Sequence, residues 1–394
     1  MRIVINGAGI AGSALAFWLR RLGHEVLLVE NAPRLREGGF VVNLWGIGYD
    51  AVERMGVLPR LLALQHVGSE LRMVDRHGRT RGGYPASVLL KLAKGRMASL
   101  ARSDIAATLY SALDDQVETL FGDSIRALHD EGASVRVEFE RAVAREADLV
   151  IGADGLHSRV RQLAFGPQSQ FEYPLGAHVA SWEVSGYRPR EEGIYVAYSA
   201  PGRYIARCPL RDDRTLFFVL VRNEYLGGVV PESHVGRVTA LAGALTGIGW
   251  ESDAILGSLA LTDTVYFDSI SQIRMDSWLK GRVALIGDAA SCPSLIAGEG
   301  AGFALAQAYV LAGELHRHPG DSAAALDRYQ ARMQSMIRRK QKLAESLAAS
   351  FVPRTELGVR LRDYTTLLMR LPVFPKLLMG RYFHHGLTLP DYGM

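Results

Sequence analysis

Three glycines near the start of the chain have the spacing that binds a diphosphate. Gly7, Gly9 and Gly12 follow a short apolar run at residues 3–5 and precede apolar residues at helical spacing up to residue 22. A buried strand, a glycine turn and a helix in this order leave free backbone N–H groups and the positive end of a helix dipole for an anion. We expect the three glycines to allow a tight turn, to let the diphosphate approach the backbone closely, and to let the helix pack closely against the strand.

An acidic residue completes this unit. A second apolar run at residues 26–29 ends at Glu30, and a carboxylate in that place accepts hydrogen bonds from a ribose diol. The same charge repels a 2′-phosphate, so the tightly bound nucleotide is not NADP. The motif alone leaves FAD and NAD open, and a structural glycine turn is the competing interpretation. The predicted contacts come from Gly7, Gly9, Ile10, Ala11, Gly12 and Glu30.

Two later segments end an apolar strand in glycine and aspartate. Residues 148–152 are followed by Asp154, and residues 281–287 are followed by Asp288. Further on, Gly300, Ala301 and Gly302 open an apolar helix that runs to residue 315. An unpaired carboxylate at the end of a buried strand is costly. Asp288 is therefore expected either to meet the hydroxyl donors of a ligand or to cap a helix.

The three motifs in this order resemble the class A flavoprotein monooxygenases, the para-hydroxybenzoate hydroxylase family. Within that family the sequence is most similar to tetracycline destructases and related polyketide-modifying oxygenases. This likeness lies in residues 35–39, 267–275 and 287–294 and in Trp278. Gly302 stands where the family often has asparagine, Ser291 where it often has histidine or tyrosine, and Asn43 where relatives carry an acid. The resemblance therefore implies FAD, and it does not extend to tetracycline as the substrate.

The resemblance also implies a reaction and further site residues. NADPH or NADH reduces noncovalently bound FAD, reduced flavin and O2 form a C4a-hydroperoxide, and oxygen passes to an aromatic, phenolic or polyketide-like small molecule. Asp288 is assigned to the ribityl chain, and the helix start at residues 300–302 to the flavin pyrimidine edge, where its dipole favours reduced flavin. The remaining assignments to FAD or transient NAD(P)H are Arg36, Arg102, Asp154 and Arg159, for which surface arginines and a helix-capping aspartate are the alternatives. No general base is assigned.

The strands and helices that the sequence pattern indicates around these residues predict an α/β fold. A Rossmann-like FAD-binding domain (1–70, 98–168 and 276–350) is interleaved with an antiparallel-sheet substrate domain (71–97 and 169–275). Short strands alternate with turns in the second region. Trp182, Tyr204 and Phe217 are the candidates for its substrate pocket, with ordinary core packing as the alternative.

The last part, residues 351–394, is expected to be a C-terminal helical segment. Leu357, Leu361, Tyr364 and Leu368 share one helical face. Pro372 and Pro375 interrupt the pattern, which favours a helix packed over the substrate entrance rather than a membrane anchor.

Composition excludes several other classes of protein. Two cysteines, Cys208 and Cys292, cannot form a cysteine-rich zinc site or a disulfide scaffold, and no metal site is expected. Forty-five basic against 41 acidic residues give a net charge of +4 without a nucleic-acid footprint. No apolar run is long enough to span a bilayer. We therefore expect a cytoplasmic monomer or homodimer without nucleic acid or stable membrane insertion.

Two other functions remain open at this point. The first is an FAD-dependent reductase or oxidase that acts on a prenyl or other small molecule without inserting oxygen. The second is a flavin-binding protein without catalysis. Peroxide release and substrate-stimulated NADPH oxidation distinguish these from a monooxygenase.

Overall fold

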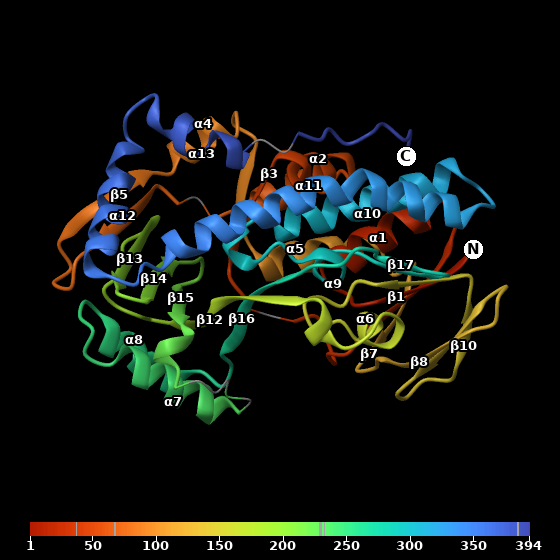
Figure 1. The fold of residues 1–394 in the computed structure, drawn as a ribbon, viewed down its shortest axis with the longest axis horizontal. Coiled ribbons are helices and arrows are strands. Elements are labelled where there is room, and N and C mark those ends of the chain that lie inside the picture. Colours follow the sequence, from red (N-terminus) through yellow and green to blue (C-terminus); the bar gives the residue numbers. More distant parts are fainter. Residues whose placement is uncertain (37, 67, 228–230, 232, 384–385) are drawn as a thin grey trace.

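The computed structural model describes residues 1–36, 38–66, 68–227, 231, 233–383 and 386–394. Figure 1 shows two regions side by side, one around β1, α1 and α10 and the other around β12–β15. The mixed α/β architecture with a C-terminal helical segment is confirmed. The domain boundaries given above stay a prediction.

The first region is built on a six-stranded sheet with the strand order β17-β18-β11-β1-β2-β7. All neighbours in it are parallel except β17 and β18. The apolar runs predicted as buried strands form its centre, because both faces of a parallel sheet are covered by helices. The strands are β1 (Arg2–Asn6), β2 (Glu25–Glu30), β7 (Glu118–Phe121), β11 (Leu149–Gly152), β17 (Leu279–Lys280) and β18 (Val283–Leu285).

Helix α1 (Ile10–Arg21) is buried along nearly its whole length, because it packs against α10 (Gly300–Arg317) and α5 (Arg102–Ser111) as well as against the sheet. The Trp18 and Tyr309 rings meet edge to face across the α1–α10 contact, with centroids 5.2 Å apart. Other helices of the chain are α2 (Gly46–Arg54), α3 (Leu58–Leu64), α4 (Ser87–Leu92), α6 (Arg159–Ala164) and α9 (Asp288–Ser291).

The second region is a seven-stranded sheet with the order β16-β12-β15-β14-β13-β4-β5. It is antiparallel apart from the β13–β4 pair, which is parallel. Two helices, α7 (His234–Leu245) and α8 (Ser252–Ser258), cover one face. The strands are β4 (Glu70–Val74), β5 (Thr80–Pro85), β12 (Glu172–Ser185), β13 (Ile194–Ala200), β14 (Arg203–Pro209), β15 (Arg214–Arg222) and β16 (Tyr266–Ile273).

Two small antiparallel sheets complete the strands. One has the order β10-β9-β8, and the other joins β3 to β6. Their bounds are β3 (Val41–Trp45), β6 (Met97–Ala101), β8 (Ile125–Asp130), β9 (Val135–Phe139) and β10 (Arg145–Ala147). Short 3-10 helices lie at Gln168–Gln170, Asn223–Tyr225, Leu259–Leu261 and Leu295–Ala297.

The C-terminal segment from residue 322 onward crosses both regions. Helix α11 (Ser322–Phe351) runs lengthwise across the molecule in Figure 1, and α12 (Glu356–Leu368) and α13 (Phe374–Phe383) follow it. The structure reverses one expectation here: Leu357, Leu361 and Tyr364 are exposed, while Val359 and Asp363 face inward. Within the described part of the chain, no helix has the length and apolar character needed to cross a bilayer.

Candidate functional site

The predicted binding residues meet at one edge of the six-stranded sheet. Gly7 follows β1, Glu30 ends β2, Asp154 follows β11 and Asp288 follows β18. These four strands are adjacent and parallel, so their carboxyl ends lie at the same edge. The turns that follow these strands also touch. If alanine replaced Gly7, its Cβ would lie 2.5 Å from the Ala153 carbonyl oxygen, and an alanine Cβ at position 287 would lie 3.0 Å from the Ala11 Cβ.

The three glycines of the first turn have different surroundings. Gly7 has a φ of +107°, a conformation that glycine adopts without steric cost. A Cβ at Gly12 would overlap the carbonyl oxygen of Gly7, so close helix–strand packing requires glycine there. A Cβ at Gly9, in contrast, would meet nothing within 4 Å. The open space lies at the N-terminus of α1, which has no side-chain cap and no acidic residue in its first turn.

Glu30 is held in place by the backbone. The Ala8 N–H donates to its Oε2 at 3.0 Å, and the Ala32 N–H donates to its Oε1 at 2.9 Å. Arg36 is exposed, and its Nε lies 3.8 Å from Glu30 Oε1. Glu30 and Arg36 are thus neighbours beside the glycine turn. Glu37, part of the resemblance at residues 35–39, lies outside the described residues.

Asp154 has a structural role in this geometry. Its carboxylate accepts from the Asn6 Nδ2 at 2.8 Å, the Ser158 hydroxyl at 2.5 Å and the backbone N–H groups of Arg159 and Val160 at 2.7 and 3.1 Å. These bonds join β1 to the start of α6. The alternative of a helix-capping aspartate is therefore realised, and any contact of Asp154 with FAD stays a prediction.

Asp288 has a different environment. Burial raises the pKa of its carboxyl group, and the positive charge of Arg102 opposes this rise. The carboxylate faces the start of α10, because a Cβ at Gly300 would lie 3.4 Å from Asp288 Oδ1. Arg102 begins α5, and a Cβ at Gly39 would lie 3.5 Å from the Arg102 Cβ. A partly buried acid, an arginine and a helix N-terminus are thus close together, and hydroxyl donors would offset the desolvation cost of the carboxylate.

Gly302 has a packing role that the sequence did not reveal. A Cβ at Gly48 would overlap the Cα of Gly302, and one at Gly302 would lie 3.5 Å from the Gly48 Cα. Helices α2 and α10 therefore touch backbone to backbone within the first turn of α10. The contact restricts position 48 to glycine, whereas a Cβ at position 302 would stand at an ordinary van der Waals distance from Gly48.

Sequence reasoning also missed a buried ion pair beside the start of α10. Lys340 of α11 lies with its Nζ 3.0 Å from Glu299 Oε1 and also donates to the Tyr382 carbonyl. The Tyr382 hydroxyl donates to the carbonyl of Ala297. Burial lowers the pKa of Lys340, and the charge of Glu299 opposes this fall. Helix α13 is thereby fixed over the loop before α10, a contact between residues too far apart in sequence for a motif to reveal.

The three aromatic pocket candidates lie on two faces of the second sheet. Tyr204 belongs to an apolar cluster that includes Phe40, Phe218 and Ile296, and the Phe40 and Phe218 ring centroids are 6.4 Å apart. Trp182 and Phe217 lie on the opposite face, in the core beneath α7 and α8, with 2% and 0% of their surface exposed. The structure therefore does not bring Trp182 and Phe217 together with Tyr204.

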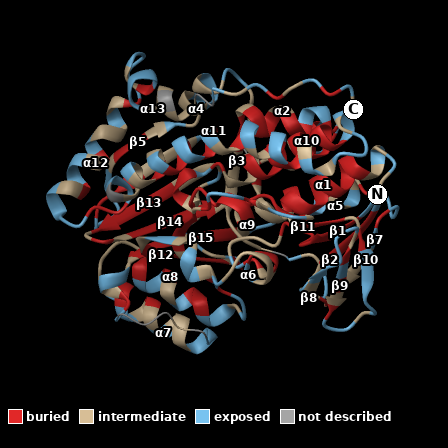
Figure 2. Ribbon diagram, turned by 45° about the vertical axis from the view of Figure 1, so that its right-hand side comes forward, coloured by how far each residue is buried: buried red, intermediate tan, exposed pale blue. Residues whose placement is uncertain are grey.

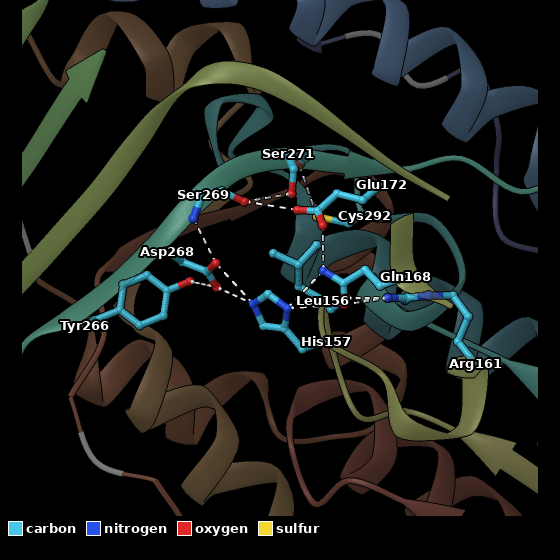
Figure 3. Close-up of polar contacts among 10 residues, drawn as sticks. All are labelled: Leu156, His157, Arg161, Gln168, Glu172, Tyr266, Asp268, Ser269, Ser271 and Cys292. Atoms are coloured by element: carbon cyan, nitrogen blue, oxygen red, sulfur yellow. Dashed lines mark hydrogen bonds and ion pairs between the residues drawn. The ribbon is translucent and has the colours of Figure 1, made fainter. Parts of the chain in front are cut away.

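A histidine in the second motif joins the two regions (Figure 3). His157 Nε2 lies 3.1 Å from both carboxylate oxygens of Asp268 on β16, and its Nδ1 faces the amide of Gln168. Gln168 in turn donates to Glu172 at 2.7 Å. The hydrogen bond that His157 donates to the Asp268 carboxylate is the main cause that raises the pKa of His157. The sequence pattern alone did not identify His157 as part of such a network.

A cavity of about 510 Å³ opens elsewhere, between the loop after α3 and the β14–β15 turn. Its walls are largely polar and include His66, Arg190 and Tyr195. None of the residues of the three motifs lines it. Among the described residues, no group of histidine, cysteine, aspartate and glutamate side chains is arranged to hold a metal ion.

Comparison with known proteins decides the family. Residues 1–343 match a family model described as an FAD binding domain. The chain belongs to this family of flavin-dependent monooxygenases. The monooxygenase is 38% identical to an uncharacterised protein of Mycobacterium tuberculosis over 86% of this chain and 91% of that protein. It is 30% identical to the FAD-dependent monooxygenase asL4 of Sarocladium schorii over 81% of this chain and 76% of that protein.

Solved structures agree with this assignment. The crystal structure of tetracycline destructase Tet(51) superposes with a TM-score of 0.83 at 28% identity and covers 99% of both chains. The expected resemblance to the para-hydroxybenzoate hydroxylase family and to tetracycline destructases is therefore confirmed. The cofactor of the monooxygenase is FAD.

The described residues fit this cofactor. The open space at Gly9 admits a diphosphate to the N-terminus of α1, and Glu30 stands at the next strand end for a ribose diol. The desolvated Asp288 offers an acceptor for hydroxyl groups. The start of α10 directs backbone N–H groups to the same place. A ligand with a diphosphate, a diol and a hydroxylated chain thus meets complementary groups along this edge.

The His157–Asp268 contact predicts a pH-dependent stability of the monooxygenase. A histidine whose pKa is raised by folding stabilises the native state below its unfolded pKa of about 6.5 and loses this effect as pH rises through the higher folded value. His157→Gln should therefore lower the free energy of unfolding at pH 5.5 more than at pH 9. Urea denaturation at both pH values measures this difference.

Two controls make that prediction specific. His77→Gln changes an exposed histidine outside this network and should give the same small effect at both pH values. The double variant with Asp268→Asn should show coupling between the two residues at pH 5.5 and none at pH 9. Equal effects of His157→Gln at the two pH values would show that the ion pair does not contribute.

Proposed function

We propose that this monooxygenase uses NADPH or NADH and O2 to hydroxylate an aromatic, phenolic or polyketide-like small molecule. The observation that carries the proposal is the apolar cluster of Phe40, Tyr204, Phe218 and Ile296. Phe40 comes from the segment beside Arg102, whose N–H donates to the Phe40 carbonyl at 3.1 Å. Ile296 comes from the loop between Asp288 and α10. The loops beside Asp288 and Arg102 and this face of the second sheet therefore share one apolar cluster.

Each part of this lining has a role in the proposed reaction. When bound, FAD supplies hydride acceptance and the activation of O2. The aromatic rings offer flat apolar surfaces on which a ring-shaped substrate can stack. The same rings and Ile296 exclude water, which protects oxygen transfer from side reactions. The start of α10 and Arg102 place positive potential near Asp288, where it would stabilise negative charge on the reduced cofactor.

The names of related proteins support the substrate class. One relative is called a tetracycline destructase and another an FAD-dependent monooxygenase of a fungus. Polycyclic and phenolic compounds match the aromatic lining chemically. We therefore place the substrate of this chain among electron-rich rings or enols.

The test is oxidation of NADPH and NADH under ¹⁸O2 with a panel of phenols and polyketides. The expected result is that a substrate stimulates cofactor oxidation and leaves with one ¹⁸O atom. Reduction of a substrate without ¹⁸O would favour the reductase alternative. Peroxide release without any product from the panel would contradict the proposed substrate class, and failure of both nucleotides to reduce the flavin would contradict the monooxygenase reaction.

Arg36 tests where the nicotinamide nucleotide docks. Its guanidinium is exposed beside Glu30. It can therefore attract the negatively charged NADPH or NADH to a transient docking position. Arg36→Ala should raise the KM for NADPH several-fold while FAD content stays unchanged, and the wild-type KM should rise with ionic strength because salt screens exposed contacts. Steady-state kinetics and absorbance at the flavin band measure both. Loss of FAD with an unchanged KM would place Arg36 in the flavin site alone.

A further inference from the structure

The C-terminal helices expose an unusual amount of apolar side-chain surface. Sixteen large hydrophobic side chains are exposed among the described residues, and nine of them lie between residues 351 and 378. In α12, Leu357, Leu361 and Tyr364 are 77%, 64% and 59% exposed. Val373 and Leu377, just before and within α13, are each 74% exposed. We call these five residues the C-terminal apolar face.

The orientation of α12 is fixed by its other side. The Gly83 N–H donates to the Thr366 hydroxyl at 2.6 Å, and a Cβ at Gly82 would overlap the Asp363 carbonyl. Arg362 forms an ion pair of 2.8 Å with the buried Asp363 and donates to Ser199 at 2.6 Å. A helix held this closely against β5 cannot turn its leucines inward without breaking these contacts. The exposure of these leucines is therefore a consequence of how α12 packs against β5.

Positive charge surrounds the C-terminal apolar face. Arg360 and Lys376 are exposed and form no ion pair within the part of the chain that the structure describes. Glu356 is the exposed acidic residue of the stretch 351–380, since Asp363 is buried. Helix α4, which contacts α13, is followed by the exposed Lys94. An apolar helix face with basic residues at its border is typical of a helix that lies in a membrane interface.

We propose that this face docks the protein on the surface of an anionic phospholipid bilayer. The leucines would enter the boundary between headgroups and acyl chains, while Arg360 and Lys376 would contact lipid phosphates. A second copy of this chain is the less suitable occupant, because a two-fold contact through this face would bring its like charges together. α12 and α13 lie at one end of the molecule (Figures 1 and 2), so docking leaves the six-stranded sheet in water.

The docked face lies beside the aromatic cluster of the second sheet. Phe351 belongs to the same exposed stretch, and its ring centroid is 6.0 Å from that of Tyr204. An apolar molecule dissolved in the bilayer would therefore meet Phe351 first and Tyr204 behind it. The passage of a substrate from the bilayer to Tyr204 rests on the proposed function, whereas docking on the bilayer does not.

The experiment is co-sedimentation of the FAD-loaded full chain with phosphatidylcholine vesicles, with and without phosphatidylglycerol. Binding is expected to the anionic vesicles and to weaken as salt rises. Leu361→Ser and Leu377→Ser should each lower the partition coefficient about tenfold, because each removes one buried leucine from the interface. Arg360→Gln with Lys376→Gln should weaken binding to the anionic vesicles only.

The controls separate lipid docking from other occupants. Leu261→Ser removes a leucine that is 76% exposed outside this face and should leave vesicle binding unchanged. Flavin absorbance and thermal unfolding report whether each variant is folded. Absence of vesicle binding overturns the proposal, as does binding that Leu361→Ser leaves intact. A dimer in analytical ultracentrifugation that Leu361→Ser dissociates, without vesicle binding, would assign the face to a second copy. These outcomes do not depend on whether the flavin transfers oxygen.

Discussion

Replacing Asp288 with alanine is expected to release most of the FAD without destabilising the apoprotein. We expect the carboxylate, which follows β18, to accept hydrogen bonds from hydroxyl groups of the cofactor, and hydrogen bonds to a charged group contribute about 1.5–3 kcal/mol. The Kd for FAD should therefore rise about 10- to 100-fold. Burial raises the pKa of Asp288, so its ionised form costs the empty fold free energy at neutral pH. The thermal midpoint of the apoprotein should consequently stay the same or increase.

Flavin fluorescence titration and thermal unfolding of apoprotein measure the two effects separately. Asp276→Ala is the matched control, because it removes a fully exposed carboxylate that pairs with Arg338. That variant should bind FAD like the original protein. Stoichiometric FAD in purified Asp288→Ala would remove Asp288 from the site, and a marked fall in apoprotein stability would show that its role is structural.

The glycine turn predicts two opposite phenotypes from the same chemical change. Gly12→Ala places a methyl group against the Gly7 carbonyl oxygen, which belongs to the backbone and cannot move aside. We expect the free energy of unfolding to fall by about 3 kcal/mol. Gly9→Ala meets open space at a φ of −76°, so stability should change by less than about 0.5 kcal/mol. FAD affinity should nevertheless fall about tenfold or more, an effect of about 1.4 kcal/mol, because the methyl group stands where the diphosphate approaches the backbone.

Urea denaturation of the apoproteins and FAD titration distinguish the two variants. Gly257→Ala in α8 is the control, since its Cβ also meets nothing within 4 Å but lies outside the strand ends. It should leave FAD affinity unchanged and raise the free energy of unfolding by at most about 1 kcal/mol, because alanine favours the helix more than glycine does. If Gly9→Ala binds FAD normally, the open space above α1 is not the diphosphate site.

The motif residues could be predicted because their geometry is local or follows from sheet order. A strand, a glycine turn and a helix determine where Gly7, Gly9 and Gly12 lie within a few residues. Glu30 and Asp288 each end an apolar run, and the carboxyl ends of adjacent parallel strands share an edge. The type of fold and a dinucleotide ligand therefore followed from residue order, and the resemblance of the three ordered motifs to a known family added FAD.

The face of the second sheet that we propose for substrate binding could not be predicted in the same way. Phe217 and Phe218 are neighbours in β15, and successive side chains of a strand point to opposite faces. Both faces of the second sheet are apolar, since one is covered by α7 and α8 and the other meets the cofactor loops. Alternation alone thus gives no reason to choose Phe218 over Phe217, and the register of β15 against β12 and β14 makes the choice.

The sequence by itself determined which residues form the strand-end site, because strand–turn–helix units specify their own geometry over short stretches of chain. Only the tertiary structure decided which aromatic face meets that site, that His157 pairs with Asp268, and that the leucines of α12 point outward. These contacts join residues more than 100 positions apart, or depend on which side of a helix finds a partner. For α12 the partner is β5, whose glycines at 82 and 83 admit the polar side of the helix and leave the apolar side exposed.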